Sequence, residues 1–175
     1  HVEIAMRYED PGIDLALNNL KLKGFNKVYV VPLYPHNAMA TTITTKVEVE
    51  RLAKEIHPEV ELKFIKPFYK DEKYIKAISK GVRKYILEHN FDKLIFSYHG
   101  IPKRQAKKTD LTGAHCFENN DCCEVESLGS SDCYKAHTVQ SSILIAKELG
   151  LKSSEWEIAY QSRICLLYTS DAADD

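Results

Sequence analysis

The residues best suited to chemistry lie where an apolar strand meets a turn. Lys93-Leu94-Ile95-Phe96 has the composition of a strand and leads into Ser97-Tyr98-His99-Gly100-Ile101-Pro102-Lys103-Arg104. A neutral imidazole can take up a proton near pH 7 or bind a borderline divalent metal. Ligands bind beyond the carboxyl ends of strands in open α/β sheets, so His99 is a candidate site residue. A histidine that only hydrogen-bonds a neighbouring loop fits this position equally well.

An arginine stands at the end of another predicted strand. Arg7-Tyr8 closes an apolar run that begins at Val2. A guanidinium at a strand end can hold a carboxylate through two parallel hydrogen bonds. Spacing alone favours the simpler interpretation, a surface arginine paired with Glu9 or Asp10. A further strand-end loop, Pro32-Leu33-Tyr34-Pro35 followed by Thr41-Thr42, is typical of a rigid, packed crossover.

Cysteines are concentrated in one polar stretch of the chain. Four of the five cysteines lie there: Cys116, Cys122, Cys123 and Cys133. Nothing in the sequence favours an oxidising compartment, and buried core cysteines would be expected on apolar faces, which this stretch lacks. Four thiolates suit Zn²⁺ or a [2Fe–2S] cluster, and the spacing selects neither. His115 or His137 could replace one thiolate. The sequence therefore predicts a metal centre of some kind.

Strands and amphipathic helices must alternate to position these residues. The predicted strands cover 2–8, 27–35, 60–68, 93–98 and 156–161, and the predicted helices cover 10–24, 41–56, 71–89 and 138–150. Asp10 is the expected N-cap of the first helix, Pro11 its first turn and Gly24 its end. In the third helix the side chains expected to be buried are those of Tyr74, Ile75, Ile78, Val82, Ile86 and Leu87. This alternation predicts βαβ units and a mostly parallel sheet.

Size and charge exclude some classes of function. The 175 residues carry 24 basic and 25 acidic side chains, a net charge of −1. That balance gives no reason to expect nucleic acid or a membrane as a partner. No apolar run approaches the ~20 residues of a membrane span, and no signal peptide opens the chain. We expect a cytoplasmic protein, seen as an internal fragment that starts in mid-strand and carries a non-native tail over 164–175.

Four motifs in a fixed order resemble bacterial ferrochelatases over residues 1–163. They are Ala5-Met6-Arg7-Tyr8, Val31-Pro32-Leu33-Tyr34-Pro35 with Thr41-Thr42, Phe96 to Arg104, and Tyr160-Gln161-Ser162-Arg163. The resemblance implies two Rossmann-like lobes with mostly parallel sheets, each only partly present, with the porphyrin held between them. Residues 1–66 would be the later part of the N-terminal lobe. Residues 67–163 would be the earlier part of the C-terminal lobe, with a Cys-rich insertion at 105–135 and a boundary at Lys66-Pro67-Phe68.

The resemblance also implies an activity, the insertion of Fe²⁺ into protoporphyrin IX to form haem. His99 matches a histidine that faces the porphyrin and either removes pyrrole protons or delivers the metal. Arg7, with Tyr8 beside it, would orient the porphyrin through a propionate. The four cysteines look like the internal [2Fe–2S] segment of some bacterial members, which favours this cluster over zinc. The intact enzyme could associate peripherally with a membrane.

The chain also departs from the family pattern. The glutamate partner of the histidine lies beyond the last residue, and Ile164 onward does not match, so this stretch alone is expected not to insert iron at a useful rate. The loop at 105–112 lacks the usual Gly-Asp-Pro-Tyr run. The alternative function is an iron–sulfur or zinc module that senses or carries electrons on a Rossmann-like scaffold. His99 and Arg7 argue against it, because a cluster carrier needs neither.

Overall fold

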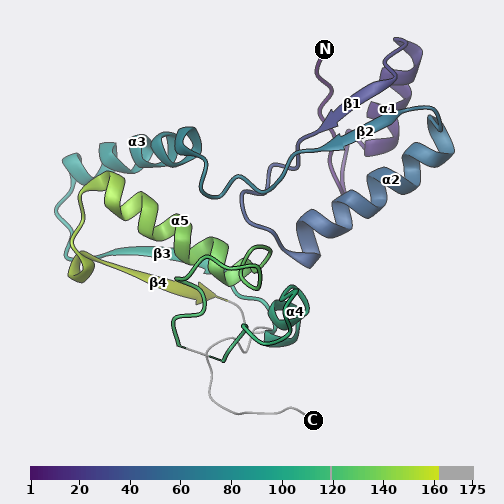
Figure 1. Cartoon of the computed structure of the whole chain (residues 1–175). Helices are drawn as coiled ribbons and strands as arrows, with labels where there is room; N and C mark the ends of the chain where they lie inside the picture. The colour runs from purple at the N-terminus through teal and green to yellow at the C-terminus, as the bar shows by residue number, and fades with distance from the viewer. Residues whose placement is uncertain (119, 162–175) are drawn as a thin grey trace. The chain divides into compact units, whose positions relative to one another are not determined.

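The computed structural model describes residues 1–118 and 120–161 (Figure 1). Contacts group the chain into two compact units that divide between Pro67 and Phe68. This division falls within the Lys66-Pro67-Phe68 segment. Each unit holds helices and a two-stranded parallel sheet, so the predicted α/β class with parallel strands is confirmed.

The first unit is a βαβ arrangement preceded by a helix (Figure 1). Its elements are α1 (Ile13–Leu22), β1 (Lys27–Val30), the π-helical turn η1 (Met39–Ile43), α2 (Thr44–Ile56) and β2 (Glu61–Phe64). β1 and β2 pair in register from Lys27 opposite Glu61 to Val30 opposite Phe64. The core consists of Ile13 and Leu17 of α1 with Val49 and Ala53 of α2. Side chains at helical spacing therefore hold both helices together, as the sequence predicts.

The segment before α1 differs from its prediction. Residues 2–8 are not a strand: a single bridge joins Met6 to Gly12, and no strand within the described ranges pairs with this segment. Its apolar side chains are consequently exposed, Val2 by 84%. The helix also starts later than expected, at Ile13 after Gly12 rather than at Asp10. The N–H of Met6 donates to the carbonyl of Pro11 over 2.7 Å. This hydrogen bond holds Pro11 in the loop before the helix.

The strands of the first unit are shorter than predicted. β1 ends at Val30, shortly before Pro32, which has no N–H to donate to the ladder. β2 ends at Phe64, the residue opposite Val30, because its partner strand ends there. Exposure alternates along both strands, so one face of each strand is covered and the other is open. Tyr29 on the open face of β1 is 58% exposed. Gly24 does follow α1 with a φ of 77°, as predicted for the residue after a helix.

In the second unit one long helix packs on a parallel strand pair and a second long helix packs against the first. Its elements are α3 (Glu72–Glu88), β3 (Leu94–His99), α4 (Lys103–Lys108), α5 (Tyr134–Leu149), the 3₁₀ turn η2 (Ser153–Glu155) and β4 (Trp156–Gln161). β3 and β4 pair from Leu94 opposite Trp156 to His99 opposite Gln161. Both predicted strands are confirmed. α5 covers the face of Tyr98 and Tyr160, while the face that carries His99 is exposed.

The helices of the second unit agree with the predicted helices in part and differ in burial and in where they start. Asp71 caps α3 by accepting from two backbone N–H groups, those of Lys73 and Tyr74. Ile75 is buried as expected, but Ile78 and Leu87 are exposed, so their predicted burial is wrong. α5 starts at Tyr134 rather than Thr138, and α4 forms where only an irregular insertion was expected.

Candidate functional site

His99 ends β3 on the exposed face of its sheet. Strand alternation places it on the side opposite Tyr98 and next to Gln161, its partner on β4. The buried Gly100 follows, and its N–H donates to the carbonyl of Gln161 at 3.0 Å. Pro102 then precedes α4. The structure therefore puts an accessible imidazole at the carboxyl edge of the sheet, the position that the sequence predicts.

Two tyrosines fix the strands just before that edge. The hydroxyl of Tyr98 bonds Ser142 of α5 over 2.8 Å, and that of Tyr160 bonds Thr138 over 2.7 Å. Burial raises the pKa of Tyr98 above its ordinary value, so the phenol stays protonated. These two hydrogen bonds attach both strands to α5, one residue before His99 and its partner Gln161. Ser162, Arg163 and Cys165 lie outside the described residues.

Arg7 lies in the loop before α1 and faces α2. Its Nη1 is 3.9 Å from Oε1 of Glu48, and its guanidinium carbon is 4.7 Å from the centre of the Tyr8 ring. The ion pair is therefore with Glu48, and the expected alternative partners, Glu9 and Asp10, are not the ones found. Nε of Arg7 is buried and has no hydrogen-bond partner within the described part of the chain. This arginine is thus incompletely paired.

A cavity of about 610 Å³ adjoins Arg7. Its walls are residues 6–10 and Gly12 of the loop and the first two residues of α1, together with Glu48, Arg51 and Leu52 of α2. Thr41 and Thr42 belong to η1, which leads directly into this helix. Two predicted features thus meet at α2: Arg7 pairs with Glu48 of this helix, and the threonine-bearing loop leads into its first turn. Tyr8 lines the same cavity and is largely exposed.

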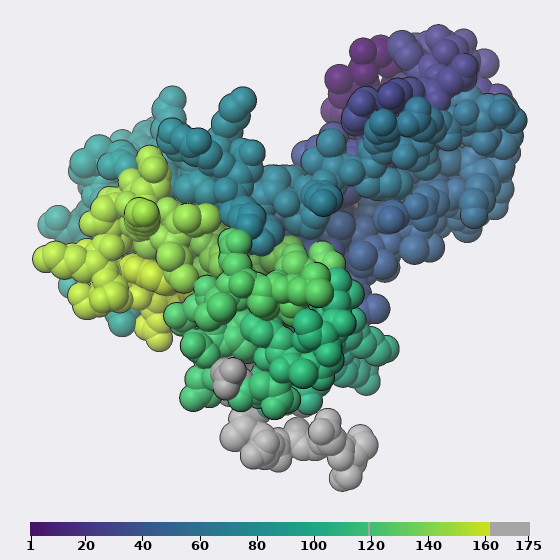
Figure 2. Space-filling view, viewed as in Figure 1, coloured from purple at the N-terminus to yellow at the C-terminus, as the bar shows by residue number. Residues whose placement is uncertain are grey.

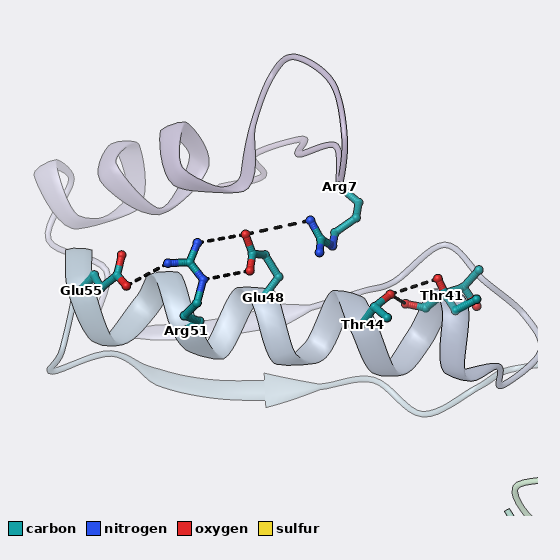
Figure 3. A network of polar contacts seen from close by, with 7 residues as sticks. Arg7, Thr41, Thr44, Glu48, Arg51 and Glu55 are labelled. Carbon is teal, nitrogen blue, oxygen red and sulfur yellow. Dashed lines mark hydrogen bonds and ion pairs between the residues drawn. The ribbon is translucent and has the colours of Figure 1, made fainter. Parts of the chain in front are cut away.

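Sequence reasoning missed the two charged residues of α2 beside Arg7. Arg51 donates from Nε and Nη2 to both oxygens of Glu48, at 2.9 and 3.0 Å, and from Nη1 to Glu55 at 2.8 Å (Figure 3). The hydrogen bond from Arg51 lowers the pKa of Glu48, which stays ionised. Glu48, Arg51 and Glu55 follow one another at helical spacing, which is visible in the sequence. Their approach to Arg7 is a tertiary contact that the sequence does not reveal.

The four cysteines of the insertion gather around one apolar cluster. Cys122, Cys123 and Cys133 are buried with Ile101, Ala106 and Ala136, and Cys116 packs against them. The expectation that they avoid apolar faces is therefore wrong. All four are free thiols, and the sulfurs of Cys122 and Cys123 are 3.7 Å apart. The insertion is the green region of Figure 2.

The thiols differ in their ease of ionisation. The Cys123 thiol hydrogen-bonds the sulfur of Cys133, which lowers the pKa of Cys133 and raises that of Cys123. Burial raises the pKa of Cys116 to about 12. Four soft donors in apolar surroundings fit a metal centre by their chemistry. Across residues 1–118 and 120–161, however, no three His, Cys, Asp or Glu side chains are already arranged around a common metal position.

Side chains around the thiols hold the loop itself. Asp110 accepts hydrogen bonds from the hydroxyl and N–H of Thr112 and from the N–H groups of His115 and Cys116, which keep its pKa well below the ordinary range. Nε2 of His115 donates to the carbonyl of Cys122 at 2.7 Å. Nε2 of His137 donates to Ser131, and its ring stacks on Tyr69. Both imidazoles thus support the backbone, which favours the cysteines over them as ligands.

The loop also requires a glycine at position 129. A Cβ there would overlap Cβ of His115 and lie 2.7 Å from its Cγ and 2.8 Å from Oδ1 of Asp110. We expect Gly129→Ala to destabilise the protein by about 1–3 kcal/mol, as overpacking does. The measurement is the free energy of unfolding in urea. Gly81→Ala is the control: it adds the same methyl to open space on α3 and should stabilise slightly. Equal effects of the two substitutions would contradict the steric argument.

Comparison with known proteins agrees with the motifs. A family model described as Ferrochelatase matches residues 1–166. A ferrochelatase of Pseudomonas fluorescens (strain Pf0-1) is 37% identical over 164 residues, 93% of this chain and 48% of that protein. Ferrochelatases of Stutzerimonas stutzeri (strain A1501) and Azotobacter vinelandii (strain DJ) are 37% and 36% identical over similar stretches. The chain spans about half the length of these relatives. It belongs to the ferrochelatase family.

Proposed function

We propose that this chain forms part of a ferrochelatase, a lyase that inserts Fe²⁺ into protoporphyrin IX to form protohaem. The observation that carries the proposal is the accessible imidazole of His99 at the carboxyl edge of β3, in a chain that matches the family over residues 1–166. Residues 1–66 would be the later part of one lobe and residues 67–163 the earlier part of the next. Ferrochelatase relatives about twice as long contain both stretches within one polypeptide.

The proposed roles follow from the chemistry of each side chain. Insertion of Fe²⁺ requires that two pyrrole N–H protons leave the porphyrin. The His99 imidazole would accept such a proton or pass the substrate metal to the ring, and an accessible imidazole suits either role. Arg7, beside Tyr8, would orient the porphyrin by pairing with a propionate. Its unpartnered Nε–H supports this role, because a buried donor without a partner favours a ligand that can accept from it.

We further propose that Cys116, Cys122, Cys123 and Cys133 hold a [2Fe–2S] cluster, with Zn²⁺ as the alternative occupant. The four thiols around one apolar cluster support a metal centre of this kind. When bound, such a cluster supplies one-electron chemistry and cross-links the loop. Free thiols also favour a reducing compartment, the cytoplasm. Among the helices described, none is both long and apolar enough to cross a bilayer.

A chimera tests the proposed function. The matching half of the Pseudomonas fluorescens ferrochelatase is replaced by residues 1–163 of this chain, and the product is expressed in bacteria that lack ferrochelatase. We expect growth without added haem, together with loss of protoporphyrin fluorescence when the purified chimera meets Fe²⁺. A well-folded chimera that binds iron or zinc in its cysteine loop but makes no haem would instead favour the sensor or electron-carrier alternative.

A further inference from the structure

Two arginines share one carboxylate beside the cavity of the first unit, and they share it unequally (Figure 3). Arg51 takes both oxygens of Glu48 in hydrogen bonds of 2.9 and 3.0 Å. Arg7 approaches the same carboxylate only to 3.9 Å, beyond hydrogen-bond distance. The Nε–H of Arg7 is buried without a partner in the described part of the chain. Arg51 therefore donates from all three of its guanidinium nitrogens, whereas Arg7 lies beyond hydrogen-bond distance of Glu48.

We propose that Arg51 is a positioning residue, which holds Glu48 in a two-point hydrogen-bonded pair and so keeps the Arg7 guanidinium available to a carboxylate of the porphyrin. The proposal rests on the proposed function, since it takes the propionate as the ligand of Arg7. It adds Glu48 and Arg51 to the site and gives each a role. Glu55 supports the arrangement, because it binds the remaining Nη1 of Arg51 and fixes the plane of its guanidinium.

The pair between Arg51 and Glu48, here called the clamp, matters because Glu48 and a ligand carboxylate would otherwise compete for Arg7. Without Arg51, Glu48 would be free to form its own two-point pair with Arg7, and a ligand would have to displace it. With Arg51 in place, the ligand takes Arg7 while Glu48 keeps both of its hydrogen bonds. No charge is then left unpaired in the partly buried site, where an unpaired charge is costly. The exchange is favourable because both carboxylates end with a partner.

The surrounding charges indicate that the orientation of Arg7, more than the general field, selects the ligand. The cavity walls carry four acidic side chains, Glu9, Asp10, Asp14 and Glu48, against two basic ones. A small free anion would not be concentrated there. A carboxylate carried on a large apolar ring gains its affinity elsewhere and needs only a correctly directed donor pair. Arg7 held apart from Glu48 provides that pair.

Porphyrin binding to the 175-residue chain tests the proposal. Protoporphyrin IX and its dimethyl ester, which has no carboxylate, are titrated in the same detergent buffer and followed by porphyrin fluorescence. We expect Arg51→Met to weaken binding of the free acid about tenfold and leave the ester unchanged. Adding Glu48→Gln to Arg51→Met should restore binding to within about twofold, because the competitor is gone. Lys54→Met is the matched control and should change little, because it removes another exposed positive charge from α2, away from the cavity walls.

A second readout does not depend on the porphyrin. The ¹⁵Nε–H signal of Arg7 should shift in Arg51→Met, when Glu48 pairs with it, and return in the double variant. If the wild-type chain bound neither porphyrin, Arg7 would not be a porphyrin contact in this part of the enzyme, and the Arg7 signal would still test whether Arg51 keeps Glu48 away from Arg7. An unmoved signal, or a loss of acid and ester binding alike without recovery in the double variant, would overturn the role of Arg51.

Discussion

Replacing His99 with alanine is expected to lower the rate of haem formation by the chimera roughly 100- to 10,000-fold, the range that general acid–base groups contribute. Without the imidazole, the porphyrin loses the group proposed to accept a pyrrole proton or to deliver Fe²⁺. The measurement is the initial rate at which protoporphyrin fluorescence is lost under anaerobic conditions with Fe²⁺. If metal delivery dominates, a higher Fe²⁺ concentration should recover part of the rate.

The fold should tolerate this substitution. His99 lies on the exposed face of β3, so its removal leaves no buried cavity and should hardly change the thermal midpoint. His89→Ala is the control, because it removes another exposed imidazole, at the end of α3, away from the edge of the sheet. Visible absorbance from the cysteine loop should persist in both variants. Haem formation at the wild-type rate in His99→Ala would show that another group performs the step.

The strand pair that carries His99 was predictable because its signals are local. Leu94, Phe96 and Tyr98 alternate with more exposed residues and are followed by a glycine and a proline, which together specify a strand and its end. Trp156, Ile158 and Tyr160 alternate with more exposed residues in the same way. The register is set by the pairing of the strands, and the packing of α5 adds the hydroxyl contacts of Tyr98 and Tyr160. Position and exposure of His99 follow from these local patterns.

The failed predictions concern contacts with distant partners. Val2 to Tyr8 has a strand composition, but a strand forms only beside another strand, and none in the described residues pairs with it. The partner of Arg7 was expected among its sequence neighbours and is instead Glu48, which α2 brings close. The polar stretch around the cysteines gave no sign that Ile101 and Ala136 would enclose them. Composition describes a segment, whereas burial depends on what folds against it.

Replacing Cys133 with serine should remove most of the metal from the cysteine loop. Cys133 is buried at the start of α5, and its sulfur accepts a hydrogen bond from Cys123 that favours the thiolate, the form that binds metal. Serine is similar in size but is a poor ligand for iron or zinc. We expect bound iron to fall at least about tenfold, since loss of an outer-shell partner alone costs that much. The measurement is iron per chain and the visible spectrum after anaerobic purification.

Cys165→Ser is the matched control, because it removes the fifth cysteine, which lies outside the four-cysteine loop. Its iron content and spectrum should equal those of the wild type. If the wild-type protein were colourless and held one zinc ion that Cys133→Ser loses, the metal of the cysteine loop would be zinc and not an iron–sulfur cluster. Equal metal in wild type and Cys133→Ser would reject Cys133 as a ligand. In the chimera, haem formation that survives in a folded, metal-free Cys133→Ser variant would place the metal outside the insertion step. His99 and Arg7 would then be sufficient, on this part of the chain, for iron insertion without the metal of the cysteine loop.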